Sequence, residues 1–189
     1  MPIAFYEQFV KPQVGVNNYV SVIHDPRPSS SYLQSYTVAY LGFVVEGRKV
    51  THLNLPIDRL KQLVIKSIDD NVANWFGCDV GKDCIRSQSL LDTNVLEIKE
   101  IICKFNMTKA DRLIFHESLM THAMVLTGYH LDGSDKVDRF EVENSWGKTG
   151  TNDGYLTMTN NWFDELNAYE AKPIVLFPWD PYGSLAKHN

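Results

Sequence analysis

His122 and Asn144 are two polar residues whose types and positions could do chemistry together. His122 opens an apolar run and shares one face of a predicted strand with Met124 and Leu126. Asn144 closes residues 139–144, in which apolar and charged side chains alternate. A buried Asn needs partners for both its carbonyl and its NH₂ group, and a neighbouring antiparallel strand can supply His122 as one of them. The pair is therefore either a satisfied core contact or a functional His–Asn site.

Strand-like segments must position this pair. Three runs rich in β-branched and aromatic residues, separated by glycine-containing turns, cover residues 122–129, 139–144 and 155–159. They predict a twisted antiparallel sheet or half-barrel. Upstream, apolar residues recur at helical spacing from Ile57 to Ile68, behind Pro56, which suits the first turn of a helix. Residues 72–78 then predict a buried strand, so that a helix leads into the sheet.

The predicted fold class is α+β, with an antiparallel sheet or half-barrel subdomain and flanking helices in a single unit, residues 1–189. The parts expected along the chain are an extended N-terminal segment (1–35), a core (36–165), an insertion over that core (81–120) and a C-terminal tail (166–189). Residues 36–45 fit a strand or a short helix, and short helices are expected around 96–105 and 110–119. Trp162 starts a predicted helical turn.

The composition excludes several classes of protein. With 44% hydrophobic and 22% charged residues, a chain of 189 residues can bury a sizeable core, which excludes intrinsic disorder. The net charge of −5 lacks the basic excess of a nucleic-acid-binding protein. No apolar run is long enough to cross a bilayer, and the residues after Met1 do not form a secretory signal. We therefore expect a cytoplasmic protein with no membrane or nucleic-acid partner.

The three cysteines, Cys78, Cys84 and Cys103, form no C-x-x-C pair and predict neither a disulfide framework nor a zinc module. Cys78 ends the predicted strand at residues 72–78, so we expect a buried structural thiol and not a nucleophile. Cys84 and Cys103 are expected to be incidental thiols. The sequence also contains no phosphate-binding glycine loop and no calcium-loop spacing, so we expect no cofactor and no metal.

The residues around the His–Asn pair resemble a known family. Residues 121–124, which include His122, and residues 143–147, which include Asn144, resemble the second half of papain-like cysteine peptidases. Three further stretches are similar to the bleomycin hydrolase family, the cytosolic aminopeptidase branch of that superfamily; they are residues 75–82, 119–124 and 178–186. With shorter matches near the N-terminus, the resemblance covers nearly the whole chain.

This resemblance implies a role for each residue of the site. His122 would take the proton of a cysteine thiol, and the Asn144 side-chain oxygen would accept a hydrogen bond from the far ring N–H. Trp146 would cover that contact, or it could be an ordinary core residue. The implied protein is a homohexameric cysteine aminopeptidase. It would act on peptides and small amides, hydrolysing N-terminal residues, the bleomycin amide and homocysteine thiolactone.

The family's nucleophile is missing from the matching residues. In the family, the catalytic Cys lies on an N-terminal helix in a Gln-x-x-x-x-x-Cys-Trp context, and this sequence contains no such motif. The chain therefore resembles only the C-terminal half, with His122 and Asn144 but without their Cys. Two hypotheses follow. The chain is the general-base half of a cysteine aminopeptidase, or it is a catalytically inactive truncated chain that acts as a binding or structural module.

Overall fold

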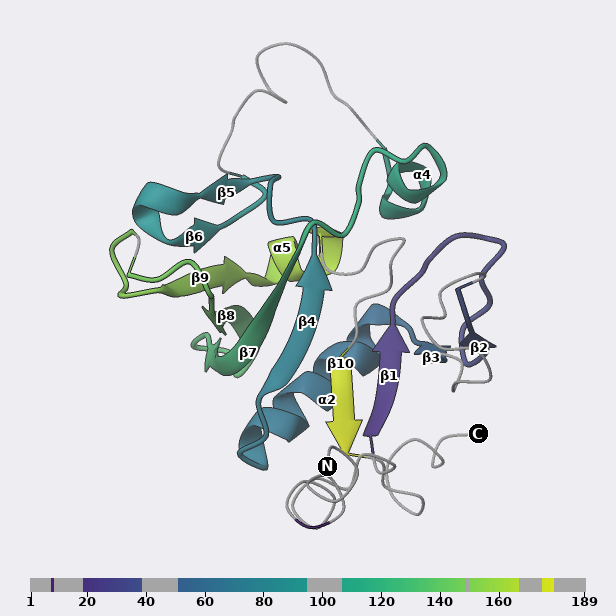
Figure 1. Ribbon diagram of the computed structural model, residues 1–189, viewed down its shortest axis with the longest axis horizontal. Coiled ribbons are helices and arrows are strands. Elements are labelled where there is room, and N and C mark those ends of the chain that lie inside the picture. The colour runs from purple at the N-terminus through teal and green to yellow at the C-terminus, as the bar shows by residue number, and fades with distance from the viewer. Residues whose placement is uncertain are drawn as a thin grey trace.

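The computed structural model describes residues 8, 19–38, 51–94, 107–148, 150–166 and 175–178. Within these ranges the strands form two sheets, one with the order β4-β7-β8-β9-β6-β5 and one with the order β10-β1-β3-β2 (Figure 1). The larger sheet contains β4 (Asn74–Cys78), β5 (Cys84–Ile85), β6 (Leu90–Leu91), β7 (His122–Leu131), β8 (Val137–Glu143) and β9 (Tyr155–Thr159). The smaller sheet contains β1 (Tyr19–Ile23), β2 (Ser35–Tyr36), β3 (His52–Asn54) and β10 (Val175–Pro178). The predicted α+β class is confirmed.

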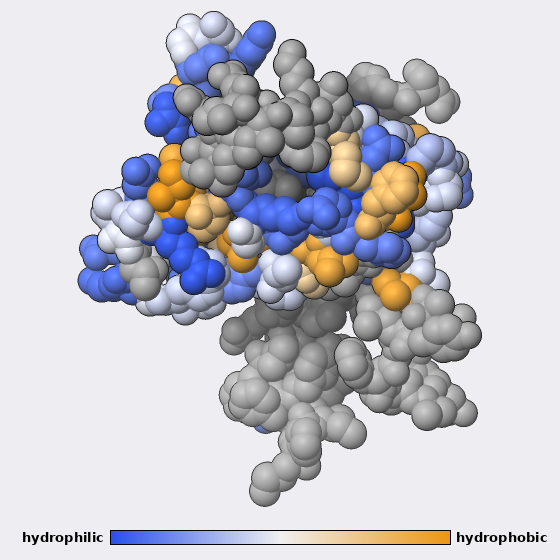
Figure 2. All heavy atoms as spheres, turned by 90° about the horizontal axis from the view of Figure 1, so that it is seen from above, coloured by the Kyte–Doolittle hydropathy of each residue, from blue (hydrophilic) through white to orange (hydrophobic). Residues whose placement is uncertain are grey.

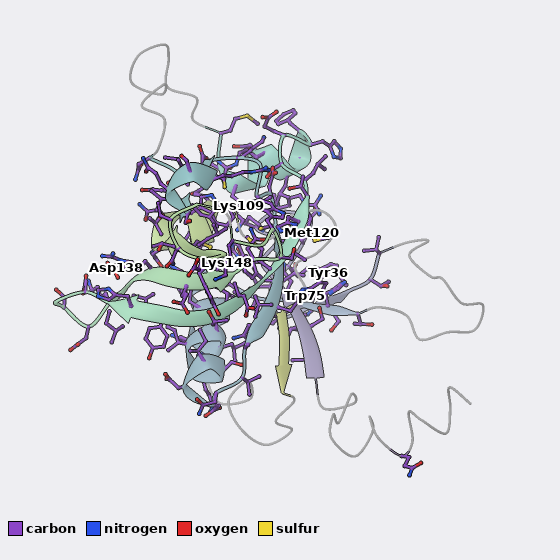
Figure 3. The ribbon with its side chains drawn as sticks, turned by 60° about the vertical axis from the view of Figure 1, so that its left-hand side comes forward. Tyr36, Trp75, Lys109, Met120, Asp138 and Lys148 are labelled. Atoms are coloured by element: carbon purple, nitrogen blue, oxygen red, sulfur yellow. The ribbon has the colours of Figure 1, made fainter. Side chains whose placement is uncertain are left out.

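Strands β7 and β8 form the hairpin that carries the His–Asn pair. They are antiparallel, with Val125 opposite Glu143, and side chains alternate along β8, where Phe140 and Val142 are buried. Figure 3 places Asp138 at the far tip of this hairpin, away from the start of β7. The predicted strands at 122–129, 139–144 and 155–159 are therefore confirmed, because period-two alternation is a strong signal for a strand with one buried face.

One hydrophobic core joins the sheets to the helices. Helix α2 (Ile57–Asp69) begins after Pro56 as predicted, and it buries Leu60 and Val64 while packing against β4 and β7. Helix α5 (Asn160–Leu166) confirms the predicted turn at Trp162. Burial of each such apolar side chain contributes roughly 1.5–3 kcal/mol. No helix within the described ranges is long and apolar enough to cross a membrane.

The N-terminal segment contains a strand. Within residues 1–35, predicted to be extended and loop-rich, residues 19–23 form β1, which pairs parallel with β3 and antiparallel with β10. Both partner strands are distant from β1 in sequence, so no local sequence pattern predicts that they pair with it. Most of the strand or helix expected at 36–45 lies outside the described residues, and only Ser35–Tyr36 form a strand.

The predicted insertion at 81–120 is in part a component of the sheet. Strands β5 and β6 pair with each other, and β6 runs parallel to β9, so the larger sheet is mixed and not purely antiparallel. Two-residue strands are too short to produce a periodic signal. Helix α4 (Lys109–Ile114) begins with a capping box between Thr108 and Asp111 and ends earlier than expected. The helix expected around 96–105 and the tail beyond Pro178 lie outside the described residues.

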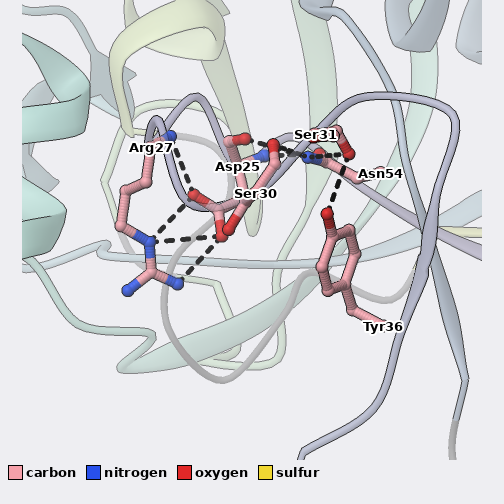
Figure 4. A network of polar contacts seen from close by, with 6 residues as sticks. All are labelled: Asp25, Arg27, Ser30, Ser31, Tyr36 and Asn54. Atoms are coloured by element: carbon pink, nitrogen blue, oxygen red, sulfur yellow. Dashed lines mark hydrogen bonds and ion pairs between the residues drawn. The ribbon is translucent and has the colours of Figure 1, made fainter.

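Asn54, fully buried at the end of β3, fixes the loop that follows β1. Its side-chain oxygen accepts a hydrogen bond from the Asp25 N–H at 2.8 Å, and its NH₂ donates to the carbonyl oxygens of Asp25 and Ser30, both at 2.9 Å (Figure 4). Arg27 forms an ion pair with Asp25 at 2.8 Å. Burial opposes ionisation of Asp25, but hydrogen bonds from Arg27 and Ser30 outweigh it and lower the pKa of this carboxyl. The loop is thus held by a saturated polar network.

Candidate active site

The hairpin brings His122 and Asn144 together as predicted. His122 is the first residue of β7, and Asn144 directly follows β8. The Nε2 atom of His122 lies 2.8 Å from the Oδ1 atom of Asn144. Since an amide oxygen can only accept, Nε2 carries the hydrogen and donates it. The neutral imidazole is thereby fixed in the tautomer whose Nδ1 has a free lone pair, which is the form that can accept a proton.

Asn144 is itself held in position by the backbone around it. Its Oδ1 also accepts a hydrogen bond from the Ser145 N–H at 2.8 Å, and its own N–H donates to the Gly154 carbonyl at 3.2 Å. Gly154 has a φ of 100°, and a Cβ there would meet the Gly147 carbonyl oxygen at 3.0 Å. Glycine is favoured here because any other residue would be strained by the positive φ and would bring its Cβ too close to the Gly147 carbonyl. The loop from Gly147 to Gly154 therefore fixes the amide that orients His122.

Trp146 covers the imidazole. Its indole stacks on the His122 ring with 4.8 Å between ring centroids and 24° between planes, and it is half-buried. The Arg86 guanidinium lies 4.3 Å from the centre of the same indole. The sequence singled out Trp146 but missed Arg86, because a polar residue between two very short strands carries no periodic signal. His122 is half-buried, and the stacked indole covers one face of its ring.

Asp79 organises the segment that leads into His122. This buried carboxylate follows β4 and accepts hydrogen bonds from the Ser118 hydroxyl at 3.0 Å, the Leu119 N–H at 3.3 Å and the Thr121 hydroxyl at 3.4 Å. A buried carboxylate is stable only with such donors around it. Sequence reasoning missed Asp79, although an acidic residue directly after a buried strand could have indicated a polar anchor.

Cys78 lies across from His122 without being bonded to it. The two residues are paired in register between β4 and β7, but Cys78 is fully buried and no hydrogen bond joins the two side chains. Burial, with the negative charge of Asp79, raises the pKa of the Cys78 thiol far above its ordinary value. Burial also raises the pKa of Cys84, opposed in part by Arg86. The prediction of a buried structural thiol at Cys78 is confirmed, and Cys103 lies outside the described residues.

The edge of the sheet beside the site exposes apolar side chains. Trp75 and Met120 are 45% and 37% exposed, and both lie on the face of β4 opposite Cys78, where Met120 packs over Gly77 (Figure 3). Seen from above in Figure 2, apolar residues interrupt an otherwise hydrophilic surface. The start of β7 thus lies between a buried face and an exposed apolar one. Within the described ranges, no three His, Cys, Asp or Glu side chains come together as metal ligands.

An imidazole at the start of one strand, oriented by an amide just after the next strand and covered by an indole, is the arrangement of the C-terminal half of a papain-like cysteine peptidase. The chain belongs to the Peptidase C1-like family, whose sequence pattern matches residues 1–183. It is 44% identical to aminopeptidase C of Lactococcus lactis subsp. cremoris over 98% of this chain and 46% of that protein. It is also 44% identical to bleomycin hydrolase of Gallus gallus, again over 98% of this chain and 45% of that protein.

A solved structure agrees with these relatives. The crystal structure of PepW from Lactobacillus rhamnosis superposes with a TM-score of 0.84 at 40% sequence identity, covering 94% of this chain and 38% of that one. The chain spans about half the length of the curated relatives it matches. The suspected relationship to bleomycin hydrolase is therefore confirmed at the level of the family.

Proposed function

We propose that this chain supplies the general base of a cysteine aminopeptidase, with His122 as the base and Asn144 as the residue that orients it. The observation that carries the proposal is the 2.8 Å contact between His122 Nε2 and Asn144 Oδ1. It fixes the tautomer and leaves Nδ1 as the proton acceptor. Among the described residues no hydrogen-bond partner of Nδ1 competes for that role.

The chemistry follows from this tautomer. Nδ1 accepts the proton of a cysteine thiol supplied by the other half of the enzyme, giving a thiolate–imidazolium pair. The thiolate attacks the carbonyl carbon of the first peptide bond, and the imidazolium returns its proton to the leaving amine. Nδ1 then deprotonates a water molecule, which hydrolyses the thioester and releases the N-terminal residue. Throughout the cycle Asn144 keeps Nε2–H in place, and Trp146 keeps water from that contact.

The finer parts of the proposal concern substrates and setting. Similarity to aminopeptidase C and bleomycin hydrolase supports N-terminal peptide bonds and the bleomycin amide as substrates. Homocysteine thiolactone fits the same chemistry, since a thioester carbonyl is attacked by a thiolate in the same way. We extend the proposal to a cytoplasmic homohexamer, which rests on the family resemblance alone.

A chimera tests the proposal. This chain replaces the matching C-terminal segment of Lactococcus lactis aminopeptidase C, and hydrolysis of an aminoacyl reporter amide is measured. The chimera should be active, and His122→Gln should lower kcat by about 10²–10⁴-fold, the usual contribution of a general base. The matched control is His130→Gln, which changes an exposed His on β7 bonded to Asp138. Equal activity of His122→Gln and the parent chimera would overturn the proposal.

The alternative is a catalytically inactive binding or structural module. Burial raises the pKa of both Cys78 and Cys84, and neither thiol is hydrogen-bonded to His122, so neither of these two cysteines is placed as the nucleophile. A folded chimera without turnover, in which the host nucleophile is intact, would favour this alternative. An in-frame upstream coding segment with a Gln-x-x-x-x-x-Cys-Trp motif would favour the enzyme.

A further inference from the structure

We propose that Arg86 is a positioning residue that holds Trp146 flat against His122, an inference that rests on the proposed function for its effect on turnover. Arg86 opens the 3₁₀ turn η3 (Arg86–Gln88) between β5 and β6. Its guanidinium carbon lies 4.3 Å from the centre of the Trp146 ring, which in turn lies 4.8 Å from the His122 ring. The indole therefore contacts the guanidinium and the imidazole at the same time.

The attraction between Arg86 and Trp146 is electrostatic. A guanidinium within about 6 Å of an indole is drawn to the negative face of the ring, and Trp is the strongest partner for such a contact. Arg86 also acts on Cys84 of the neighbouring strand β5, because its positive charge opposes the rise in the thiol pKa that burial causes. The contact of the guanidinium with Trp146 joins the turn η3 to the loop after β8.

Backbone contacts fix the distance between η3 and the Trp146 loop. Gly150 has a φ of 76°, and a Cβ there would overlap the Ser89 hydroxyl and the Arg86 carbonyl oxygen. Next to it, the Thr151 N–H donates to the Ser89 hydroxyl at 2.9 Å, and the Thr151 hydroxyl donates to the Gln88 carbonyl at 3.2 Å. The position of Arg86 relative to Trp146 is therefore set by two interlocked turns, and not by one mobile side chain.

Without Arg86, the indole loses a contact that keeps it on the imidazole. Trp146 follows Asn144 in a loop whose outer side chains are exposed, so alternative rotamers of the indole would reach solvent. Water would then compete with Asn144 for Nε2 of His122. An exposed Arg beside a catalytic His could instead bind substrate. The two roles differ in kinetics, because a positioning residue changes kcat and a substrate-binding residue changes KM.

The first test reads the stack directly by NMR in the 189-residue chain. The Trp146 ring current shifts the ring protons of His122 upfield, and Trp146→Leu defines the position without that shift. Arg86→Met should lose most of the Trp146-dependent shift. If Arg86→Met does not fold, the same measurement is made on Arg86→Gln, with the same expected loss. Arg59→Met, at a half-buried Arg on α2 whose guanidinium bonds Gln62, should keep the full shift. A wild-type shift in a folded Arg86 variant would overturn the proposal.

The second test uses turnover of the chimera. Arg86→Met should lower kcat about threefold to tenfold with KM unchanged, the range expected for one cation–π contact. A raised KM with unchanged kcat would assign Arg86 to substrate binding and overturn the positioning role. Failure of the proposed function can be told apart from failure of this inference. If the parent chimera is inactive, the NMR result is unaffected, and that result alone decides whether Arg86 holds Trp146 against His122.

Discussion

His24 and His122 both stack on an aromatic ring but differ in burial and in hydrogen-bond partner. Each imidazole stacks on an aromatic ring, His24 on Tyr32 at 5.8 Å and His122 on Trp146 at 4.8 Å. His24 is only 7% exposed, and its Nδ1 bonds the Leu55 carbonyl at 2.9 Å. Burial and the positive charge of Lys109 lower its pKa to about 4, so it is neutral near pH 7. His122 is half-buried and bonds the Asn144 side chain through Nε2, so Nδ1 has no hydrogen-bond partner among the described residues.

The two asparagines beside these histidines repeat the contrast. Asn54 makes its hydrogen bonds to backbone groups of the loop after β1, and its role is to fix that loop. The side-chain oxygen of Asn144 accepts hydrogen bonds from Nε2 of His122 and from the N–H of Ser145, so Asn144 fixes the tautomer of His122. A side-chain amide whose hydrogen bonds all go to backbone groups indicates a structural residue. A side-chain amide bonded to an imidazole whose second nitrogen has no partner indicates a candidate catalytic pair. The predictions below test this distinction.

The largest expected effect is on stability at Asn54. Asn54→Ala leaves the Asp25 N–H and the Ser30 carbonyl without their partner, and the free energy of unfolding should fall by about 3–5 kcal/mol. Urea denaturation at neutral pH measures the loss. Asn94→Ala, at an exposed position, is the control and should change stability by less than about 0.5 kcal/mol. A loss at Asn54 no larger than at Asn94 would break the comparison.

Acid should destabilise the protein through His24. Because its folded pKa is about 4 and its unfolded pKa 6.5, the unfolded chain binds the proton more tightly between these values. The contribution is present in full above about pH 6.5 and is lost as pH falls toward about 4, on the order of 3 kcal/mol. Urea denaturation at both ends of this window should show a smaller acid loss in His24→Gln. An equal acid loss in both proteins would contradict the assignment of His24 as a buried neutral imidazole.

Asn144 should affect turnover and spare stability. Asn144→Ala removes the acceptor for Nε2–H, so the chimera should lose about 30- to 100-fold in kcat, about 2–3 kcal/mol of transition-state stabilisation. Its unfolding free energy should change far less than that of Asn54→Ala. Steady-state kinetics and urea denaturation of the same preparation give both values. If Asn144→Ala keeps its kcat but loses stability, Asn144 is a structural residue, as Asn54 is, and does not orient a catalytic His.

The smallest effect is expected at Gly150. Gly150→Ala places a methyl group against Ser89 and the Arg86 carbonyl at a φ of 76°, so stability should fall by about 1–2 kcal/mol. Gly133→Ala is the matched control, because a Cβ there meets nothing within 4 Å. Thermal unfolding of the two variants compares them directly. Equal melting temperatures would show that the turns around Arg86 and Trp146 are not interlocked.

The sequence reveals the hairpin of the site because its strands have one buried and one exposed face. Alternation along residues 139–144 places Asn144 on the same side as two buried residues, and the run from His122 places the imidazole on the facing strand. Helix α2 is equally predictable, since its apolar positions recur at helical spacing behind Pro56. Local periodicity thus suffices to predict the elements that position His122 and Asn144.

The rest depends on contacts between distant segments. Strand β1 pairs with β3 and β10, and strand β6 pairs with β9, through backbone groups that leave no mark on the side-chain pattern. The sequence pattern did not indicate Arg86 for the same reason, because its partner Trp146 lies in the loop after β8 and only the folded chain brings the two residues together. Asp79 likewise acquires its role from donors about 40 residues later in the chain.

Alkylation of the nucleophile thiol in the chimera tests most directly whether His122 is the base. At about pH 5.5 a free thiol is hardly ionised, so rapid reaction with iodoacetamide reports a thiolate held by an imidazolium. We expect His122→Gln to slow this reaction by about 10²-fold or more, and His130→Gln to leave it unchanged. Alkylation as fast in His122→Gln as in the parent chimera would contradict the account.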